Sequence, residues 1–254
     1  MTVMAEDRPV AQPGQSENPL TNILVNVLVP VVALSFLSKE GDRFYHIGPV
    51  WGMVVAIAFP VLYGIRYFLQ KRRWNFFSVL GVASVLLTGG ITLLVWKQDG
   101  TIHSNAALLF AIKEASIPLV FGLTIFGSWW TATPLVRVFL YNRDLFDVPR
   151  VEQAIRQHGR EPDYRNLLFR SNLLLAGSFF LSTVMNFFLA LHFLTGVTQS
   201  REAYNVAVGR LTGWGFLVIG LPITAVFLLL IFGLLRRLKT MTGLGRDEIL
   251  LIKS

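Results

Sequence analysis

The residues best suited to chemistry are Lys113 and Glu114, which interrupt the apolar run Leu108–Phe121. Charge within such a run costs free energy, so it marks either a surface anchor or a working site. Pro118 lacks the amide hydrogen that would bond the Glu114 carbonyl four residues earlier. An ammonium, a carboxylate and a freed carbonyl therefore cluster within about one turn. Such a set suits a transport-related or structural polar site, and the alternative is a pair that only marks the membrane boundary.

The two charged side chains differ in reach. Lys113 lies four residues to the outer side of Ile117, the midpoint of the helix predicted here. Helical side chains lean towards their own N-terminus, and a lysine can extend its ammonium along an apolar surface to the interface. We therefore expect Lys113 to reach the outer interface and the shorter Glu114 to face other helices. Since neighbours on a helix point about 100° apart, each is also expected to have other partners.

Three asparagines join this set of candidate polar residues. Asn26 precedes Pro30 by four residues, the spacing already seen at Glu114, as a 3 + 3 inverted repeat of a transporter would produce. Prolines are common in membrane helices, so chance similarity is the alternative. Asn172 and Asn186 lie nearly four helical turns apart and share a face, where amides bond between helices. For these two, helix packing is the favoured interpretation.

Glycines predict where helices approach each other closely. Gly89 and Gly90 are adjacent, and Gly209 and Gly213 have GxxxG spacing, a pattern that lets backbones approach. The chain has no cysteine and only four dispersed histidines, so the sequence predicts no metal site and no cofactor. No phosphate-binding loop or Ser/His/Asp set appears either. We expect no catalysis, and a membrane enzyme ranks third among the functional hypotheses.

The element that positions these residues is a set of long apolar blocks. The chain is 53% hydrophobic and 15% charged, against about 25% charged for a typical soluble domain. About 20 apolar residues cross a bilayer as a helix. The sequence thus predicts an all-α polytopic membrane protein with a six-helix transmembrane domain over residues 20–235. The predicted spans are Leu20–Ser38, Ile47–Leu69, Asn75–Trp96, Asn105–Trp129, Ser171–Thr195 and Leu211–Leu235.

Basic residues predict the orientation. With six spans, 17 of the 23 lysines and arginines fall on the side that holds both termini. Such an excess marks the cytoplasmic side, so both termini are expected there. The net charge of +8 is explained by this topology and by attraction to anionic lipid headgroups. We expect no nucleic-acid binding.

The segments outside the spans are mostly short. Residues 1–19 are polar and contain prolines, which predicts a disordered cytoplasmic tail without a cleavable signal, and residues 236–254 are predicted to form a basic cytoplasmic tail. Thr131–Arg170 is the long exception. It is predicted to contain a surface-lying helix, followed by a helix that Asp147 caps and Gly159 ends. It serves either as a connector, the favoured interpretation, or as a docking surface for a cytoplasmic partner.

Several short motifs, in order, resemble the intracellular septation protein A family of bacterial inner-membrane proteins. They include "NVLVP", "FLQKRRW", "LLTGGITLL", "AIKEASIPL", "PLVRVFL" and "RSNLLLAGSFF", within a stretch from Asn22 to Leu235. The more specific marks are Gly89, Gly90, Thr92, Lys113, Pro134, Arg137, Asn172, Asn186 and Asn205. The resemblance implies a role in septation and envelope integrity through division or cell-wall membrane proteins, and it implies no reaction or transport substrate. The polar N-terminal tail and the longer Thr131–Arg170 segment depart from the family pattern.

Two functional hypotheses follow from these features. The first is an inner-membrane protein that acts by interaction in septation or envelope biogenesis. The alternative is a small secondary transporter or lipid-handling protein with a polar site around Lys113 and Glu114 at the membrane midplane. A polar cavity that joins Lys113, Glu114, Asn26 and Asn186 would favour the alternative. The sequence leaves the substrate, the partner and the oligomeric state open.

Overall fold

The computed structural model describes residues 24–41, 43–71, 76–141 and 145–251, without the side chains at 26, 67–68, 70–71, 76–83 and 85. The predicted tail at residues 1–19 therefore lies outside the described residues. Helices account for almost all regular structure, and the described ranges contain no strand beyond isolated bridges. The all-α prediction is confirmed.

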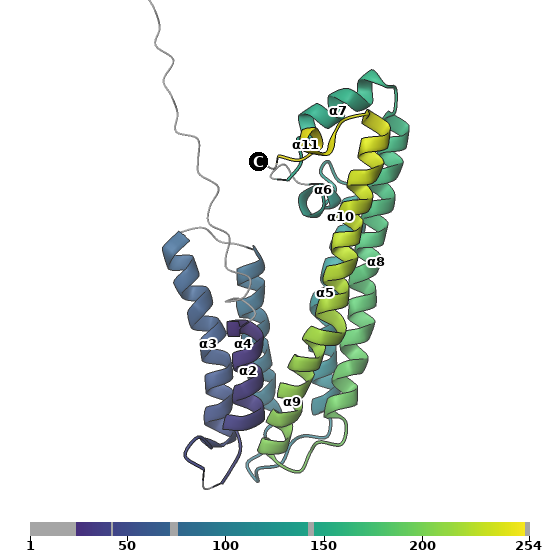
Figure 1. Ribbon diagram of the computed structural model, residues 1–254. Helices are drawn as coiled ribbons and strands as arrows, with labels where there is room; N and C mark the ends of the chain where they lie inside the picture. Colours follow the sequence, from purple (N-terminus) through teal and green to yellow (C-terminus); the bar gives the residue numbers. More distant parts are fainter. Residues whose placement is uncertain (1–23, 42, 72–75, 142–144, 252–254) are drawn as a thin grey trace, which may run out of the picture.

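The helices form two arms that meet at one end and diverge towards the other (Figure 1). The first arm contains the consecutive turns η1 (Leu24–Leu28), α2 (Val29–Val32) and η2 (Ala33–Leu37), then α3 (Gly48–Lys71) and α4 (Phe76–Val95). The second contains α5 (Ala106–Ser128), α8 (Glu161–Leu194), α9 (Arg201–Gly215), η3 (Phe216–Gly220) and α10 (Leu221–Thr242). The η elements are π-helical turns. We call the end with loops 38–47, 96–105 and 195–200 the joined end, and the opposite end the capped end.

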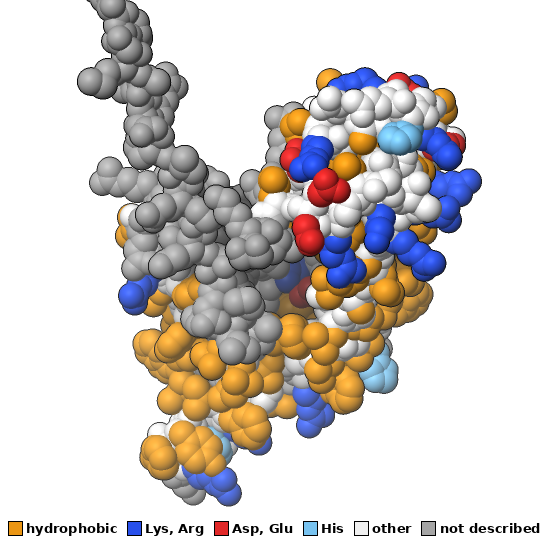
Figure 2. All heavy atoms as spheres, turned by 45° about the horizontal axis from the view of Figure 1, so that its top comes forward, with side chains coloured by type: hydrophobic (Ala, Val, Ile, Leu, Met, Phe, Trp, Pro, Cys, Tyr) orange, Lys and Arg blue, Asp and Glu red, His pale blue; other side chains and the backbone are white. Residues whose placement is uncertain are grey.

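Within the part of the chain that the structure describes, four helical stretches are long and apolar enough to cross a membrane. They are Gly48–Arg66, Ala106–Ser128, Glu161–Leu194 and the continuous Arg201–Thr242. At most 39% of each apolar window is buried within the protein, so most of its surface faces outward. Apolar side chains accordingly cover the body of the molecule in Figure 2. This outward-facing apolar surface is compatible with a lipid surrounding.

Helix boundaries differ from the predicted spans in the second arm. The helix α8, which contains the fifth predicted span, begins at Glu161 instead of Ser171. The helix α9, which leads into the sixth predicted span, begins at Arg201, inside a predicted loop. The predictions followed hydropathy, whereas these helices extend into polar sequence. The Ser200 hydroxyl caps α9 by accepting a hydrogen bond from the Ala203 backbone amide at 3.1 Å. The polar start of this helix is therefore part of the fold.

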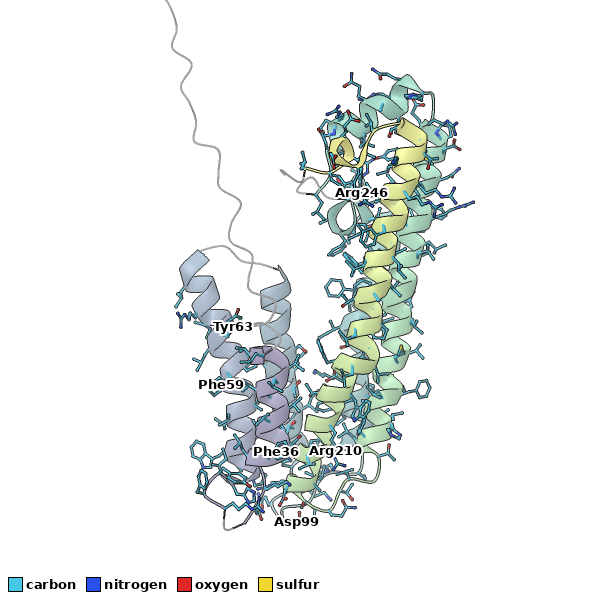
Figure 3. The ribbon with its side chains drawn as sticks, viewed as in Figure 1. Phe36, Phe59, Tyr63, Asp99, Arg210 and Arg246 are labelled. Carbon is cyan, nitrogen blue, oxygen red and sulfur yellow. The ribbon has the colours of Figure 1, made fainter. Side chains whose placement is uncertain are left out.

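Hydrogen bonds to backbone carbonyls hold the two arms together at the joined end. The side-chain amide of Asn205 on α9 donates to the Pro49 carbonyl on α3 at 2.8 Å, and the Asn205 side chain is fully buried. The Ile102 amide donates to the Thr198 carbonyl at 3.0 Å, which links two loops. Asp99 marks this end in Figure 3, and the Thr101 hydroxyl and amide, by donating to its carboxylate, lower its pKa. The joined end is thus a fixed base from which the arms diverge.

The capped end is built from the Thr131–Arg170 segment and the C-terminal residues. Its helices are α6 (Val136–Phe139), α7 (Val148–Gln157) and α11 (Arg246–Ile249), which pack with the ends of α8 and α10. Asp147 accepts a hydrogen bond from the Arg150 amide and caps α7, and Gly159 follows with a φ of 63°, as predicted. Together these elements form a cap over the second arm (Figure 1).

The structure adds detail to two predictions about this end. Within the described residues, the helix expected before Asp147 is the short α6. Val136, Leu140 and Phe146 are fully buried inside the cap, whereas Val138 is 50% exposed. Residues 236–251, which belong to the predicted basic cytoplasmic tail, are folded. α10 continues to Thr242, and the following chain returns to pair Leu250 with Phe146. The C-terminal segment therefore covers part of the apolar surface before Asp147.

Candidate functional site: a polar cavity between the arms

A cavity of about 260 Å³ lies between the two arms. Residues from α2, η2, α3, α4, α5, α8 and α9 line it, so both arms contribute to its wall. A cavity of about 150 Å³ can hold a benzene molecule, so this one has room for a small solute. Its polar lining residues are Ser84, Thr88, Lys113, Glu114, Asn186 and Thr212.

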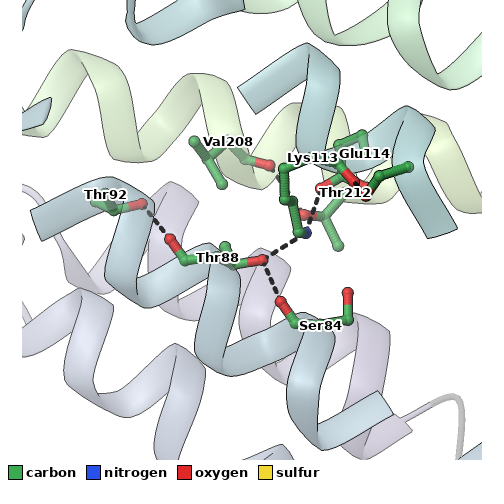
Figure 4. Close-up of polar contacts among 8 residues, drawn as sticks. Ser84, Thr88, Thr92, Lys113, Glu114, Val208 and Thr212 are labelled. Carbon is green, nitrogen blue, oxygen red and sulfur yellow. Dashed lines mark hydrogen bonds and ion pairs between the residues drawn. The ribbon is translucent and has the colours of Figure 1, made fainter. Parts of the chain in front are cut away.

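Lys113 and Glu114 form an ion pair in this wall (Figure 4). The Lys113 ammonium lies 2.8 Å from the Glu114 carboxylate and 2.7 Å from the Thr88 hydroxyl on α4. The ammonium also lies 5.3 Å from the centre of the Phe110 ring, where a cation–π attraction operates. The exposed fraction of the Lys113 side chain is 6%, whereas that of Glu114 is 27%. Both residues therefore line the cavity, and the cation is more enclosed than its counter-charge.

The expectation that Lys113 reaches the membrane interface is wrong. Its ammonium turns into the bundle because Thr88 and Glu114 offer oxygen acceptors there. The long, flexible stem also lets the ammonium meet the carboxylate of the adjacent residue, although the two residues leave the helix in different directions. Glu114 does face other helices across the cavity, as expected.

Sequence reasoning missed Ser84 and Thr88 on α4, and it named Thr92 only as a mark of the family resemblance. The Thr88 hydroxyl accepts from Lys113 and donates to the Ser84 carbonyl at 2.9 Å, and the Thr92 hydroxyl donates to the Thr88 carbonyl at 2.8 Å. Ser84, Thr88 and Thr92 are spaced by four residues and so share one helix face. This polar stripe in an otherwise apolar block was the available signal. It orients the Thr88 oxygen towards the lysine.

The predicted asparagines have different positions. Asn186 lines the cavity, and its amide donates to the Ser182 carbonyl at 2.8 Å, which fixes the side chain against α8. Asn172 is fully buried away from the cavity, and its amide donates to the Ile125 carbonyl of α5 at 3.0 Å. It therefore links two helices. The side chain of Asn26 lies outside the described residues.

Pro30 is buried in α2 and lines the cavity, between the π-helical turns η1 and η2. Such turns are rare and often occur at functional sites. Pro118 is buried within α5 but is not part of the cavity lining. The two prolines thus do not occupy equivalent places around the site.

Some of the glycines predicted to lie in helix contacts have close neighbours, and others face open space. A Cβ at Gly209 would lie 2.6 Å from the Ser35 hydroxyl, and one at Gly89 would lie 2.3 Å from an Ile57 methyl group. A Cβ at Gly213 would be at an ordinary 3.6 Å from its nearest neighbour. Gly90 faces open space. The first two positions therefore allow helices to approach around the cavity.

The arrangement can bind a polar group electrostatically. A lysine ammonium has three hydrogens, and the described residues offer it two acceptors, Thr88 and Glu114. A small anion entering beside Glu114 could accept a hydrogen bond from the same ammonium. Within the described ranges, no three histidine, cysteine or acidic residues gather in a way that could hold a metal ion. Comparison with models of known families, with curated proteins and with solved structures gave no match.

Proposed function

We propose that the chain is a membrane protein that binds a small anionic solute or headgroup at Lys113, in the manner of a secondary transporter or lipid-handling protein. The observation that carries the proposal is the convergence of Lys113, Glu114 and Asn186 on one cavity lined by both arms. Ligand sites between two helical units are common in transporters, because relative movement of the units changes access to the site. Lys113 supplies the charge, and Glu114 is the internal anion with which a ligand competes.

The cost of the ion pair supports a binding role. Apolar residues of similar volume can replace a buried ion pair without loss of stability, and often with a gain. A bundle that only had to be stable would therefore gain nothing from an enclosed ammonium. In the proposed role the ion pair keeps the empty site neutral, and an entering carboxylate or phosphate takes the place of Glu114 beside Lys113.

The membrane setting of the proposal combines the fold with the basic residues of the sequence. Four stretches suit membrane crossing, and we propose that α4 and the helical turns from Leu24 to Leu37 complete six spans. The excess of basic residues supports a cytoplasmic position for the capped end and both termini. The resemblance to the intracellular septation protein A family suggests the bacterial inner membrane and a process in envelope biogenesis. In this orientation the arms diverge towards the cytoplasm.

Cysteine labelling tests the cavity, since the natural chain has no cysteine. Thr212→Cys places a thiol in the cavity wall, and Ile125→Cys places one in the fully buried α5–α8 contact. In proteoliposomes we expect a small water-soluble thiosulfonate to label Thr212→Cys at least tenfold faster than Ile125→Cys. Short dicarboxylates and glycerol phosphate, added as candidate ligands, would then be screened for slower labelling of Thr212→Cys.

Substitution of Lys113 distinguishes binding of an anion from simple access of the labelling reagent to the cavity. A protecting anion should lose its effect when Lys113→Met is added to Thr212→Cys, while the unprotected labelling rate stays similar. If Thr212→Cys resists labelling, or if protection survives Lys113→Met, the anion site at Lys113 is wrong.

A second candidate function is interaction with division or cell-wall membrane proteins through the cap. The observation that favours it is the ordered cap surface, where Arg137 pairs with Glu152 at 3.2 Å and Arg150 pairs with Glu248. These ion pairs join α6 to α7 and α7 to α11. A partner captured by crosslinking from the wild-type cap, and lost on Arg150→Glu, would support this function.

A further inference from the structure

A second groove lies between α8 and α10, near the cap. Its volume is about 470 Å³. Arg170 and Arg237 line it together with leucines of both helices, and Asp163 and Asn166 also line it. Cavity residues such as Lys113 are absent from its wall, so the groove is a separate feature of the second arm.

The groove is apolar along one part and charged along the other. Leu174 lies one helical turn after Arg170 on α8, and Gly233 lies one turn before Arg237 on α10. Leu174 and Leu229 are 58% and 69% exposed, so the apolar part is open to the surroundings. A Cβ added at Gly233 would meet nothing within 4 Å. The groove therefore has a place for a hydrocarbon chain directly beside two guanidinium groups.

The position of the arginines matches the headgroup level of a bilayer. Phe169, next to Arg170, packs its ring 5.0 Å from the ring of Trp129. Tryptophan favours the membrane interface, and Trp129 ends the apolar helix α5. Arg237 similarly follows the apolar part of α10. Basic pockets between membrane helices suit phosphate-bearing headgroups.

The other polar residues narrow the ligand class. The Asp163 carboxylate pairs with Arg160 at 3.2 Å and is half exposed, so it can accept further hydrogen bonds. Asn166 offers an amide beside it on the same helix. A headgroup with hydroxyl groups beyond its phosphate can donate to this carboxylate, whereas a second phosphate would be repelled by it.

We propose that this groove binds one phospholipid whose headgroup has a single phosphate and free hydroxyls, the chemistry of phosphatidylglycerol. Arg170 and Arg237 hold the phosphate, because guanidinium groups suit phosphate oxygens. Asp163 and Asn166 accept the headgroup hydroxyls. One acyl chain lies along Leu174, Leu229 and Gly233. This site is independent of solute binding at Lys113.

The test measures lipid binding to the full chain in detergent by native mass spectrometry, with dioleoyl phosphatidylglycerol as the probe. We expect Arg170→Gln/Arg237→Gln to weaken binding at least tenfold. The matched control is Arg165→Gln/Arg236→Gln, which removes the same charge from the same helices outside the groove. Its effect should be less than twofold. Equal losses in both double variants would mean general charge attraction and would overturn the site.

A substitution in the apolar part tests the acyl chain separately. Gly233→Leu fills open space in the groove, and Gly127→Leu fills open space on α5, outside it. Both should fold, since neither added Cβ meets a neighbour. Only Gly233→Leu should weaken phosphatidylglycerol binding, by fivefold or more.

The source of the phosphate is tested with soluble glycerol 3-phosphate. We expect glycerol 3-phosphate to displace the phosphatidylglycerol only at a concentration at least a hundredfold higher than that of the lipid. Equal competition would show a free-anion site and reject the lipid. Binding of dioleoyl phosphatidylcholine as tight as that of phosphatidylglycerol would reject the proposed role of the headgroup hydroxyls.

Discussion

The Lys113–Glu114 ion pair predicts that removing either of its two charges lowers the stability of the protein, and by unequal amounts. Glu114→Gln retains the size of the side chain and an oxygen that can accept from Lys113, but removes the counter-charge. The ammonium is then left in a site where the lysine side chain is only 6% exposed. Lys113→Met instead removes the buried cation, and leaves a carboxylate whose side chain is 27% exposed. The first change should destabilise the protein more than the second.

The magnitudes follow from the enclosure of each group. Removing one partner of a buried ion pair costs about 3–5 kcal/mol, and the remaining bond to Thr88 places Glu114→Gln at the low end, about 3 kcal/mol. The carboxylate left by Lys113→Met is partly exposed and therefore screened by solvent, so its cost should be about 1 kcal/mol. For a chain of this size each kcal/mol shifts the melting temperature by about 2–4 °C. The expected shifts are thus about 6–12 °C and about 2–4 °C.

Thermal unfolding in a mild detergent, followed by tryptophan fluorescence, measures both shifts. The double variant Lys113→Met/Glu114→Gln is the decisive control, because it leaves no unpaired charge. It should be more stable than Glu114→Gln alone by about 2 kcal/mol. If the double variant were as unstable as the sum of the single ones, or if Lys113→Met were the more damaging change, the enclosed-cation interpretation would be refuted.

Further predictions concern topology, packing and capping. In intact cells an impermeant thiol reagent should label Gln98→Cys at the joined end and fail to label Gln157→Cys in the cap; the reverse pattern would invert the proposed orientation. Gly209→Ala should cost about 1–3 kcal/mol by overpacking, whereas Gly213→Ala should be neutral or stabilising, and equal melting temperatures would contradict this difference. Asp147→Ala should cost about 0.5–2 kcal/mol through loss of the helix cap, measured as faster amide hydrogen exchange in α7.

Hydropathy predicted the helical class, but it could not locate the helix ends. Long apolar runs predict helices because a chain in lipid must satisfy its own backbone hydrogen bonds. Helix termination depends on other features, such as Ser200 at the start of α9 and Gly243, with a φ of 72°, after α10. The polar residues between Arg201 and Leu211 were therefore assigned to a loop although they form part of a helix.

The cap was hidden from sequence reasoning because its contacts are non-local. The spacing of apolar residues before Asp147 was interpreted as one face resting on lipid. In the structure Phe146 pairs with Leu250, and the Leu251 amide donates to the Leu145 carbonyl at 3.0 Å. Nothing in the local pattern of either segment indicates the other. Only the local features of this region, the Asp147 cap and the helix end at Gly159, could be predicted.

Sequence reasoning could predict the residues of the candidate site whose burial costs much free energy. It could not predict those whose burial costs little. Lys113 and Glu114 stood out because charge in an apolar run requires compensation. Thr88 did not, since a threonine in a membrane helix can satisfy its hydroxyl on its own backbone, as this one does with the Ser84 carbonyl. The direction of the lysine was mispredicted for the same reason. The direction of the Lys113 side chain depends on the Thr88 hydroxyl of a different helix. The sequence alone does not show that α4 packs against α5 and brings this acceptor close.

The enclosed lysine bears on the choice between binding and scaffolding. A scaffold needs stable helices and an external surface, and neither requirement is served by an ammonium held between the arms. The cap supplies such a surface without involving the cavity. An ion pair in a cavity wall, with its anion more exposed than its cation, instead favours exchange of one anion for another. If both functions are present, they are separable: loss of Lys113 should abolish anion protection of the cavity and leave partner capture by the cap unchanged.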